Sequence, residues 1–374
     1  MHSKLSFRDF SMAIALVLIC GFFALVAPQF ISARNLSLLM TELSITGTLA
    51  MGMLLIILTG HIDLSVGSGV GLLGGVAAVL VAEHGVPAPL ALGLALTTGL
   101  ALWLGMGTLI VKERIPAFII TLGGLLVFKG LFLKVIHNAT IPIVQGGQSN
   151  LYSLLTTYYV PPVAGLVIAA VLVGVVVAAT LRSRAQNRAN GFVVEEAELS
   201  FLKLFLAAQA LFLVVLVTNQ FRGIPLPALI LAAVATVVHV LTRHTSFGRY
   251  LYAVGGNEEA AIVSGVPVQK VVIGAFTIMG GIVALTGFMQ TAYGGSSTTT
   301  VGDQMELDAI AACVIGGVSL KGGRGSVLGV LFGTLIIACL LNGMTLMTVP
   351  PEFKFMARGL VLTLAVWMDV RVSR

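Results

Sequence analysis

Twelve apolar stretches, most of them long enough to cross a membrane, constrain the fold of this sequence more than any other feature. They run at about residues 10–30, 36–59, 62–82, 88–111, 115–136, 160–181, 200–221, 226–242, 269–290, 305–320, 326–347 and 353–369. About 20 helical residues cross a hydrocarbon core that is about 30 Å thick. Because lipid offers no hydrogen bonds to the backbone, such stretches favour helices. We therefore predict an all-α polytopic membrane protein in which residues 1–374 form a single transmembrane domain.

Two of these stretches are predicted to be incomplete crossings. The stretch at 62–82 opens with Asp63 and is rich in glycine, and the one at 305–320 is short and contains Glu306 and Asp308. We expect about ten full transmembrane helices and two short broken or re-entrant helices.

The basic residues predict how the chain is oriented, because cytoplasmic loops collect lysine and arginine. With a cytoplasmic N-terminus, fifteen of the 21 basic residues fall on the cytoplasmic side. The other six fall on the outer side or inside the membrane: Arg34, Lys129, Lys134, Arg222, Lys354 and Arg358. This distribution predicts an even number of crossings with both termini in the cytoplasm.

Composition and missing motifs exclude most other classes of protein. Only 10% of the residues are charged, against roughly 25% in a soluble domain, so water cannot be the main solvent of the surface. The sequence has no GxxxxGK[ST] phosphate loop, no cluster of metal-ligand residues and no set of serine, histidine and aspartate in a plausible site. The basic residues form no dense runs typical of nucleic-acid binding. We expect no catalytic activity, no cofactor, no metal and no nucleic-acid partner, which leaves transport.

Acidic residues at membrane depth are the first candidates for a functional site. A carboxylate in hydrocarbon costs several kcal/mol unless it is paired, hydrated or neutralised, so it faces a pathway or the protein interior. Asp63, followed by Ser65, can cap the start of a broken helix or contact the substrate or a gate. Glu306 and Asp308 precede another short apolar run, and the same two interpretations apply to them.

Glycines at every fourth position adjoin both acidic segments. They are Gly67, Gly71 and Gly75 in one series and Gly325, Gly329 and Gly333 in the other. Small residues at this spacing let helix backbones approach closely in lipid, so we expect tight helix packing at both places.

The connection at 243–268 is expected to lie in the cytoplasm and to contain a short helix. Gly255 and Gly256 are predicted to break the chain, Asn257 to cap the next helix, and residues 258–264 to form it, with two acids in the first turn. This helix either only connects two spans or is a docking element for a cytoplasmic partner. A short ordered helix without a core of its own favours docking.

Three segments together resemble the membrane permeases of bacterial ABC sugar importers of the ribose, xylose, arabinose and galactoside type. They are the Ile-Asp-Leu-Ser-Val-Gly-Ser run at 62–68, the segment at 248–265, and the run that starts with Glu-Leu-Asp-Ala-Ile-Ala-Ala at 306–312 and continues to 323. Residues 32–35, 71–78, 312–317 and 364–369 are most similar to the members that carry xylose. His61 departs from the pattern, since relatives often have glycine or an acid there, and its role stays open.

The resemblance implies a multi-pass permease in the bacterial inner membrane that moves a monosaccharide, with xylose or another pentose expected, from the periplasm to the cytoplasm. It implies three protein partners: a separate ATPase, a periplasmic sugar-binding protein, and a second permease subunit that makes a homodimer. For contact with the ATPase it implies residues Gly248, Arg249, Gly255, Gly256, Asn257, Glu258, Glu259, Ala260, Ala261 and Gly265. For the pathway or gate we expect Asp63, Ser65, Glu306, Asp308, Gly316 and Gly317.

The main alternative is a secondary sugar transporter driven by an ion gradient, because intramembrane acids are common in that class. A channel would need a continuous polar lining, which the sequence does not show. Residues that could touch the sugar are too scattered to rank: Asn138, Gln145, Tyr293, Asn342 and Met344.

Overall fold

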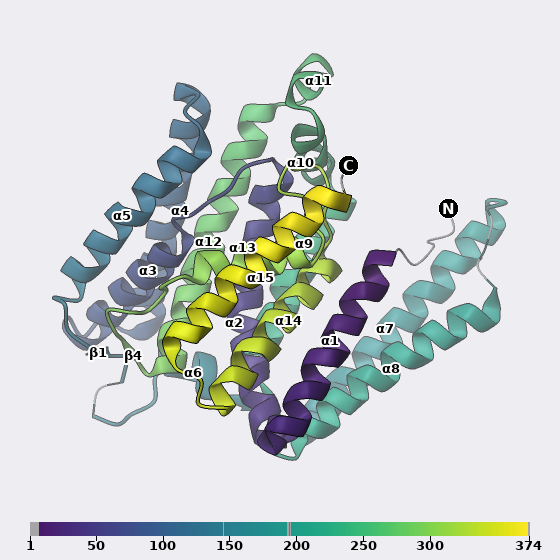
Figure 1. The fold of residues 1–374 in the computed structure, drawn as a ribbon, viewed down its shortest axis with the longest axis horizontal. Coiled ribbons are helices and arrows are strands. Elements are labelled where there is room, and N and C mark those ends of the chain that lie inside the picture. Colours follow the sequence, from purple (N-terminus) through teal and green to yellow (C-terminus); the bar gives the residue numbers. More distant parts are fainter. Residues whose placement is uncertain (1–6, 145, 193, 195, 373–374) are drawn as a thin grey trace.

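Ten long helices and two short ones form the transmembrane bundle in a computed structural model that describes residues 7–144, 146–192, 194 and 196–372 (Figure 1). The long helices are α1 (Phe7–Val26), α2 (Ala33–Leu58), α4 (Ala88–Glu113), α5 (Ala117–Val135), α7 (Pro162–Ala189), α8 (Ala197–Asn219), α9 (Leu226–His244), α12 (Val268–Gly294), α14 (Val327–Leu346) and α15 (Pro351–Val372). The short ones are α3 (Val66–Ala82) and α13 (Met305–Ile315). Eight of the long helices in the described part of the chain meet the length and hydropathy expected of a membrane span. The predicted polytopic all-α fold is confirmed.

The connections between these helices contain short elements. They are the 3₁₀ helix η1 (Pro28–Ile31), the helices α6 (Leu151–Thr157), α10 (Ser246–Gly256) and α11 (Glu258–Val263), and the strands β1 (Ile141–Pro142), β2 (Tyr159–Val160), β3 (Ile224–Pro225) and β4 (Ser296–Ser297). The antiparallel pairs β1–β4 and β2–β3 tie loops together at one end of the bundle, which we call the strand end. The opposite end, which carries α10 and α11, is called the coupling end.

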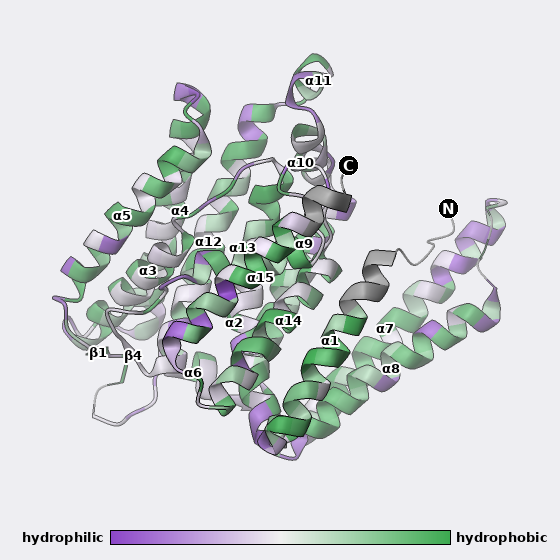
Figure 2. Ribbon diagram, viewed as in Figure 1, coloured by the Kyte–Doolittle hydropathy of each residue, from purple (hydrophilic) through white to green (hydrophobic). Residues whose placement is uncertain are grey.

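The start of α1 and the end of α15 both lie at the coupling end (Figure 1). Hydrophilic residues gather toward the two ends of the bundle, while the middle of most helices is hydrophobic (Figure 2). This distribution is what a lipid bilayer requires of the surface that it covers.

Two crossings of the bundle are discontinuous, as the sequence predicts. Residues 59–65 lead from the end of α2 into the bundle before α3 begins, and residues 298–304 lead from β4 to the start of α13. The two helix starts meet, because the backbones of Gly67 and Gly302 touch. A Cβ atom added at Gly302, where φ is +85°, would lie 2.1 Å from the carbonyl oxygen of Gly67. Neither position can hold a side chain.

Glycines of both series lie at close helix contacts, as expected, whereas Gly325 lies in the coil before α14 against the side chains of Leu54 and Val318. A Cβ atom at Gly329 would lie 2.0 Å from the carbonyl oxygen of Gly316, and one at Gly333 would lie 2.0 Å from that of Ala312. These contacts pack α13 antiparallel to the first half of α14. In the other series, Gly71 and Gly75 lie against the ring of Phe132 on α5.

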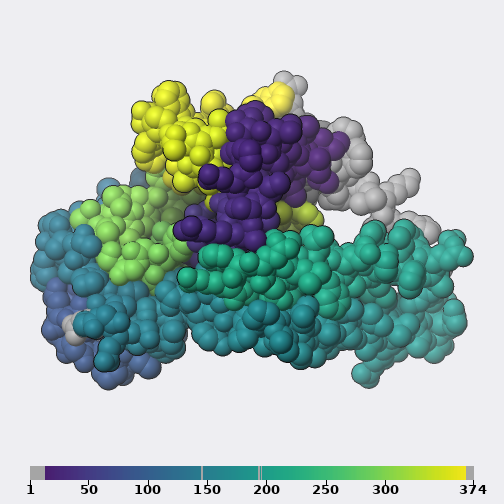
Figure 3. Space-filling model, turned by 90° about the horizontal axis from the view of Figure 1, so that it is seen from below, coloured from purple at the N-terminus to yellow at the C-terminus, as the bar shows by residue number. Residues whose placement is uncertain are grey.

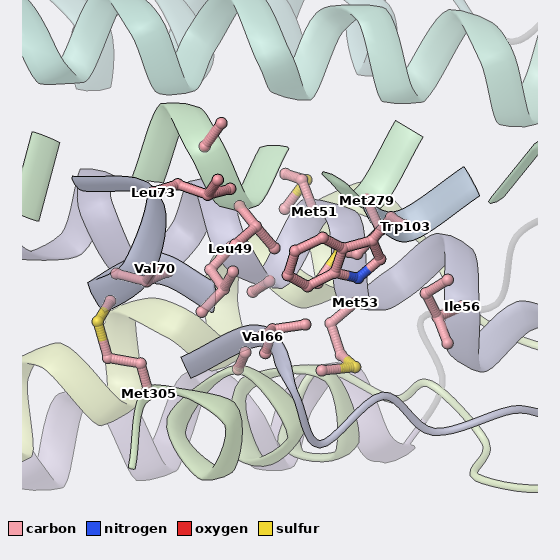
Figure 4. Packing of buried hydrophobic residues seen from close by; sticks show 14 of the residues in the cluster. Leu49, Met51, Met53, Ile56, Val66, Val70, Leu73, Trp103, Met279 and Met305 are labelled. Carbon is pink, nitrogen blue, oxygen red and sulfur yellow. The ribbon is translucent and has the colours of Figure 1, made fainter. Parts of the chain in front are cut away.

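The core of the bundle surrounds α2, whose side chains are almost all buried from Leu49 to Leu58. Trp103 on α4 is fully buried, and Figure 4 shows its indole ring among the side chains of Met51, Met53 and Met279. A Cβ atom at Gly69 would lie 2.2 Å from the Trp103 ring, so this glycine makes room for it.

Helices α7 and α8 form a hairpin at the edge of the molecule. Figure 3 shows these teal helices extending beyond the rest of the surface. About a tenth of each helix's most apolar window is buried, and the hairpin packs on the bundle through α8 and α2. Most of its surface is therefore available to lipid.

Candidate functional site

Asp63 lies deep in the discontinuous crossing before α3 and is fully buried. Its Oδ1 accepts hydrogen bonds from the backbone N–H of Ser65 at 2.8 Å and from the Ser65 hydroxyl at 2.6 Å. Its Oδ2 accepts one from the indole Nε1–H of Trp103 at 2.7 Å. The N-cap residue of α3 is Ser65, and its side chain makes no capping bond.

These contacts correct the interpretation of Asp63 as the cap of α3. The carboxylate instead fixes the turn before the helix and binds the turn to α4 through Trp103. A fully buried group with three donors has no free face for a sugar in this conformation, although Asp63 was expected at the pathway or gate. The sequence gives no local signal for Trp103, which lies 40 residues further along the chain.

The two acids of α13 lie in its first turn, where the positive end of the helix dipole stabilises them. The N-cap residue is Gln304, and no side chain caps this helix, so the expected capping role is also corrected. Asp308 pairs with Arg358 of α15 at 3.1 Å. Glu306 is half-buried and points at Gly67, because a Cβ atom there would lie 2.0 Å from its Oε2.

A second ion pair lies beside the first and was not expected from the sequence. Lys129 of α5 pairs with Asp303, which lies just before α13. The Lys129 ammonium also donates to the carbonyl oxygen of Thr299 at 2.8 Å. The side chains of Lys129 and Asp303 are 29% and 49% exposed.

Lys129, Asp303, Glu306, Asp308 and Arg358 thus form one charged cluster, contributed by α5, α13 and its preceding coil, and α15. Lys129 lies twelve residues into α5 and Arg358 seven residues into α15, which places them about 18 Å and 10 Å along these helices. Both residues lie inside their helices rather than at the ends, so we expect them at membrane depth. We call the surface that carries this cluster the α5–α15 face.

Gly316 and Gly317, which were also expected at the pathway or gate, lie at the other end of α13. Gly316 is buried against the backbone of Gly329, and Gly317 has a φ of +91°. Gly316 lets α13 and α14 approach, and Gly317 supplies the turn that follows α13. Neither carries a side chain toward the charged cluster.

The coupling end is built from α10 and α11. Thr245 caps α10 by accepting from the N–H of Gly248. Asn257 caps α11 by accepting from the N–H of Ala260 at 2.9 Å, as predicted. Gly255 and Gly256 do not break the chain, because α10 continues through both and ends at Gly256. The predicted break falls at Asn257 instead.

Gly255 has a different structural role, which joins α10 to the end of α2 and to the loop between α13 and α14. A Cβ atom at Gly255 would lie 1.9 Å from the carbonyl oxygen of Leu58, the last residue of α2, and 2.5 Å from the nitrogen of Gly323. The N–H of Gly323 donates to the same Leu58 carbonyl at 3.1 Å. Three chain segments therefore meet through backbone atoms at one point, which we call the glycine joint.

Helix α11 projects from the coupling end (Figure 1). Its two acids Glu258 and Glu259 are exposed, and so are the apolar side chains of Ile262 and Val263, the latter by 89%. Arg249 on α10 is exposed, while Gly248 and Ala261 are buried and Ala260 and Gly265 are exposed. Exposed charge beside exposed apolar surface is typical of a docking element.

Two of the scattered candidates for sugar contact meet at an acid that the sequence analysis missed. Glu42 of α2 accepts a hydrogen bond from the hydroxyl of Tyr293 at 3.0 Å and one from the amide of Asn342 at 3.4 Å. The Asn342 carbonyl accepts from the amide of Asn35 at 2.9 Å. This network joins α2, α12 and α14 near the strand end.

The remaining candidates do not join that network. Asn138 is exposed with a φ of +54°, Met344 packs against α1 residues, and Gln145 lies outside the described residues.

Comparison with known proteins assigns this architecture to a family. Residues 35–366 match the family described as branched-chain amino acid transport system / permease component. The chain is 38% identical to the xylose transport system permease protein of Haemophilus influenzae over 98% of this chain and 97% of the relative. It is 37% identical to that of Escherichia coli K12, over 99% and 94% of the two chains. It is 31% identical to the ribose import permease protein of Bacillus subtilis, over 94% and 89%. No solved structure matches the chain.

Proposed function

This chain belongs to the family of transport-system permease components. From that premise we propose that it is the membrane-spanning subunit of an ATP-driven importer of a pentose, with xylose as the first candidate. The relatives that match almost its whole length are named for xylose and ribose transport. They favour a sugar over the amino acids in the family description.

The charged cluster on the α5–α15 face is the observation that carries the transport proposal. Lys129 and Asp303 are partly exposed at membrane depth, where contact with lipid would cost several kcal/mol. A second copy of the chain would cover this face and leave a water-lined pathway between the two copies. A two-fold axis along the pathway satisfies the closed symmetry that most homo-oligomers adopt.

The chemistry of the cluster fits a neutral polyol. Carboxylates accept hydrogen bonds from hydroxyl groups, while ammonium and guanidinium groups donate to them. Asp303 and Asp308 are paired with Lys129 and Arg358, and a neutral sugar can exchange hydrogen bonds with these pairs without adding a charge of its own.

The energy would come from a separate ATPase bound at the coupling end, with α11 as its main contact. Ile262 and Val263 offer apolar contact and Glu258 and Glu259 offer charge. The coupling end would face the cytoplasm, which places the basic loops there and both termini inside. The strand end would then receive sugar from a periplasmic binding protein.

Reconstitution tests the energy source. Proteoliposomes that contain this chain, its ATPase and its binding protein should take up labelled xylose when ATP is inside, and should continue when ionophores collapse all ion gradients. Uptake by this chain alone, driven by a proton or sodium gradient, would overturn the proposal. Competition by unlabelled ribose, xylose and branched-chain amino acids then ranks the cargo.

The pathway is tested by charge removal on α5. Lys129→Gln should lower the rate of xylose uptake strongly, because it leaves Asp303 unpaired at membrane depth. Lys134→Gln is the matched control, since Lys134 lies on the same helix and is exposed near its end. Equal rates in the two variants would remove the α5–α15 face from the pathway.

The docking assignment is tested on α11. The double variant Glu258→Lys, Glu259→Lys should insert normally but lose ATPase association and uptake. Glu198→Lys on the α7–α8 hairpin is the control, because Glu198 is equally an exposed acid. Unchanged association in the double variant would contradict a contact at α11.

A further inference from the structure

A cavity of about 1040 Å³ opens beside α11 at the coupling end. Three segments far apart in the sequence form it: residues 60–62 after α2, the turn from α4 to α5 at 110–118, and residues 258–272 from α11 into α12. None of the residues expected at the pathway lines it. Its volume is at the upper end of the range for sites that bind small molecules, so it can accept several side chains of a partner.

The lining of the cavity combines apolar walls with two cations. Ile115, Phe118 and Val272 contribute apolar surface, and Arg114 and Lys270 contribute positive charge. Both cations are exposed, and neither forms an ion pair with any other residue in the described ranges. Two free cations above an apolar wall select a partner that carries a carboxylate next to an apolar side chain.

Arg114 is held in place by its backbone. It ends α4 in the left-handed conformation, with φ +55° and ψ +32°. Glycine or asparagine adopts this conformation more readily, and other residues pay roughly 1–2 kcal/mol for it. The tight turn to α5 therefore fixes the backbone position from which the Arg114 side chain extends. This lowers the entropic cost of forming an ion pair at this site.

The cavity is continuous with the surface of α11. Glu258 and Ile262, which belong to the exposed surface of that helix, also line the cavity. Any protein that covers α11 from this side reaches the mouth of the cavity as well. Gly60, His61 and Ile62 also line the cavity, and they are the start of the discontinuous crossing that leads to α3.

We propose that this cavity is a second ATPase contact, which receives an acidic segment of the ATPase between Arg114 and Lys270. The inference rests on the proposed docking of an ATPase at α11. It adds that the ATPase holds the chain at two places, and that the second place touches the discontinuous crossing directly.

An anionic lipid headgroup shares the carboxylate's charge but fits the cavity less well. Glu258 in the wall repels any anion, but a protein segment can place a hydrogen-bond donor opposite it, which a phosphate group lacks.

Site-specific photocrosslinking tests the contact without removing a charge. The probe p-benzoylphenylalanine is placed at Phe118 in the full complex, with Val263 on α11 as the positive control. Ile119 is the matched negative control, because it is 57% exposed but does not line the cavity. We expect adducts with the ATPase from positions 118 and 263 but not from 119.

The outcomes separate this inference from the proposed function. Adducts from position 263 but not from position 118 overturn the second contact and leave docking at α11 intact. Adducts from 118 with lipid alone assign the cavity to lipid and also overturn it. An absence of ATPase adducts from both positions contradicts the docking proposal itself.

Charge reversal gives an independent measurement. Arg114→Glu or Lys270→Glu should weaken the affinity of the detergent-solubilised chain for its ATPase by about tenfold, and Arg114→Lys should preserve it. Lys112→Glu is the control, since Lys112 is exposed two residues away and does not line the cavity. Equal affinities for Arg114→Glu and Lys112→Glu would refute the role of Arg114.

Discussion

The ion pair between Asp308 and Arg358 gives the sharpest test of the charged cluster, because it joins α13 to α15 at a largely buried place. The Asp308 side chain is 8% exposed and that of Arg358 is 23% exposed, with 3.1 Å between the charged atoms. At an effective dielectric constant of about 20, their attraction is about 5 kcal/mol. Desolvation of both ions offsets much of that attraction, so the net contribution of the intact pair is small.

Removing one partner has a larger effect than removing both. Arg358→Met keeps the apolar stem but leaves Asp308 buried and unpaired, so we expect the free energy of unfolding to fall by about 3–5 kcal/mol. Asp308→Asn strands the guanidinium group and should cost a similar amount. The double variant leaves no buried charge without a partner, so most of the lost free energy of unfolding should return.

Unfolding of the purified chain in mixed detergent micelles measures these differences through tryptophan fluorescence. The chain has two tryptophans, of which Trp103 is fully buried and serves as the reporter. Lys354→Met is the control on the same helix, since Lys354 bonds to the hydroxyl of Thr345 and lies close to the helix start. If the double variant is as unstable as the sum of the single variants, the two charges do not interact and the reasoning fails.

Two further predictions concern other parts of the fold. Gly302→Ala should prevent accumulation of the folded protein in the membrane, since the new Cβ would meet the Gly67 carbonyl at 2.1 Å. Gly359→Ala, where nothing lies within 4 Å, should have normal yield on a blot. Trp103→Phe removes a donor to buried Asp63 and should lower the melting temperature in detergent, with a free-energy loss of about 2–3 kcal/mol; an unchanged melting temperature would show that the bond contributes nothing.

The helices were predictable because each crossing carries its own signal. Lipid demands about 20 apolar residues per span, and residues 327–346, for example, form α14 almost as the stretch at 326–347 predicts. The two broken crossings were also predictable, because the acids Asp63 and Glu306 interrupt otherwise apolar stretches.

The partners of the acids were not predictable, because they come from distant helices. Asp63 faces Trp103 across 40 residues, and Lys129 pairs with Asp303 across 174. In the sequence, Lys129 is one of six basic residues outside the cytoplasmic set and has no motif around it. Only the contact of α5 with the coil before α13 turns it into part of a site.

Gly255 and Gly256 show a different limit of sequence analysis. Glycine lowers the helix propensity of a segment, so a pair of glycines predicts a break. In the structure the helix continues to Gly256 because the tertiary contact at Gly255 outweighs that preference. Glycine that bends the chain and glycine that admits a neighbouring backbone look the same in a single sequence.

The glycine joint affects how this protein can change over evolutionary time. Leu58, Gly255 and Gly323 meet there through backbone atoms, so the contact does not depend on the identity of most neighbouring side chains. Side chains on the surface around the joint can therefore be exchanged while the three chain segments keep their positions.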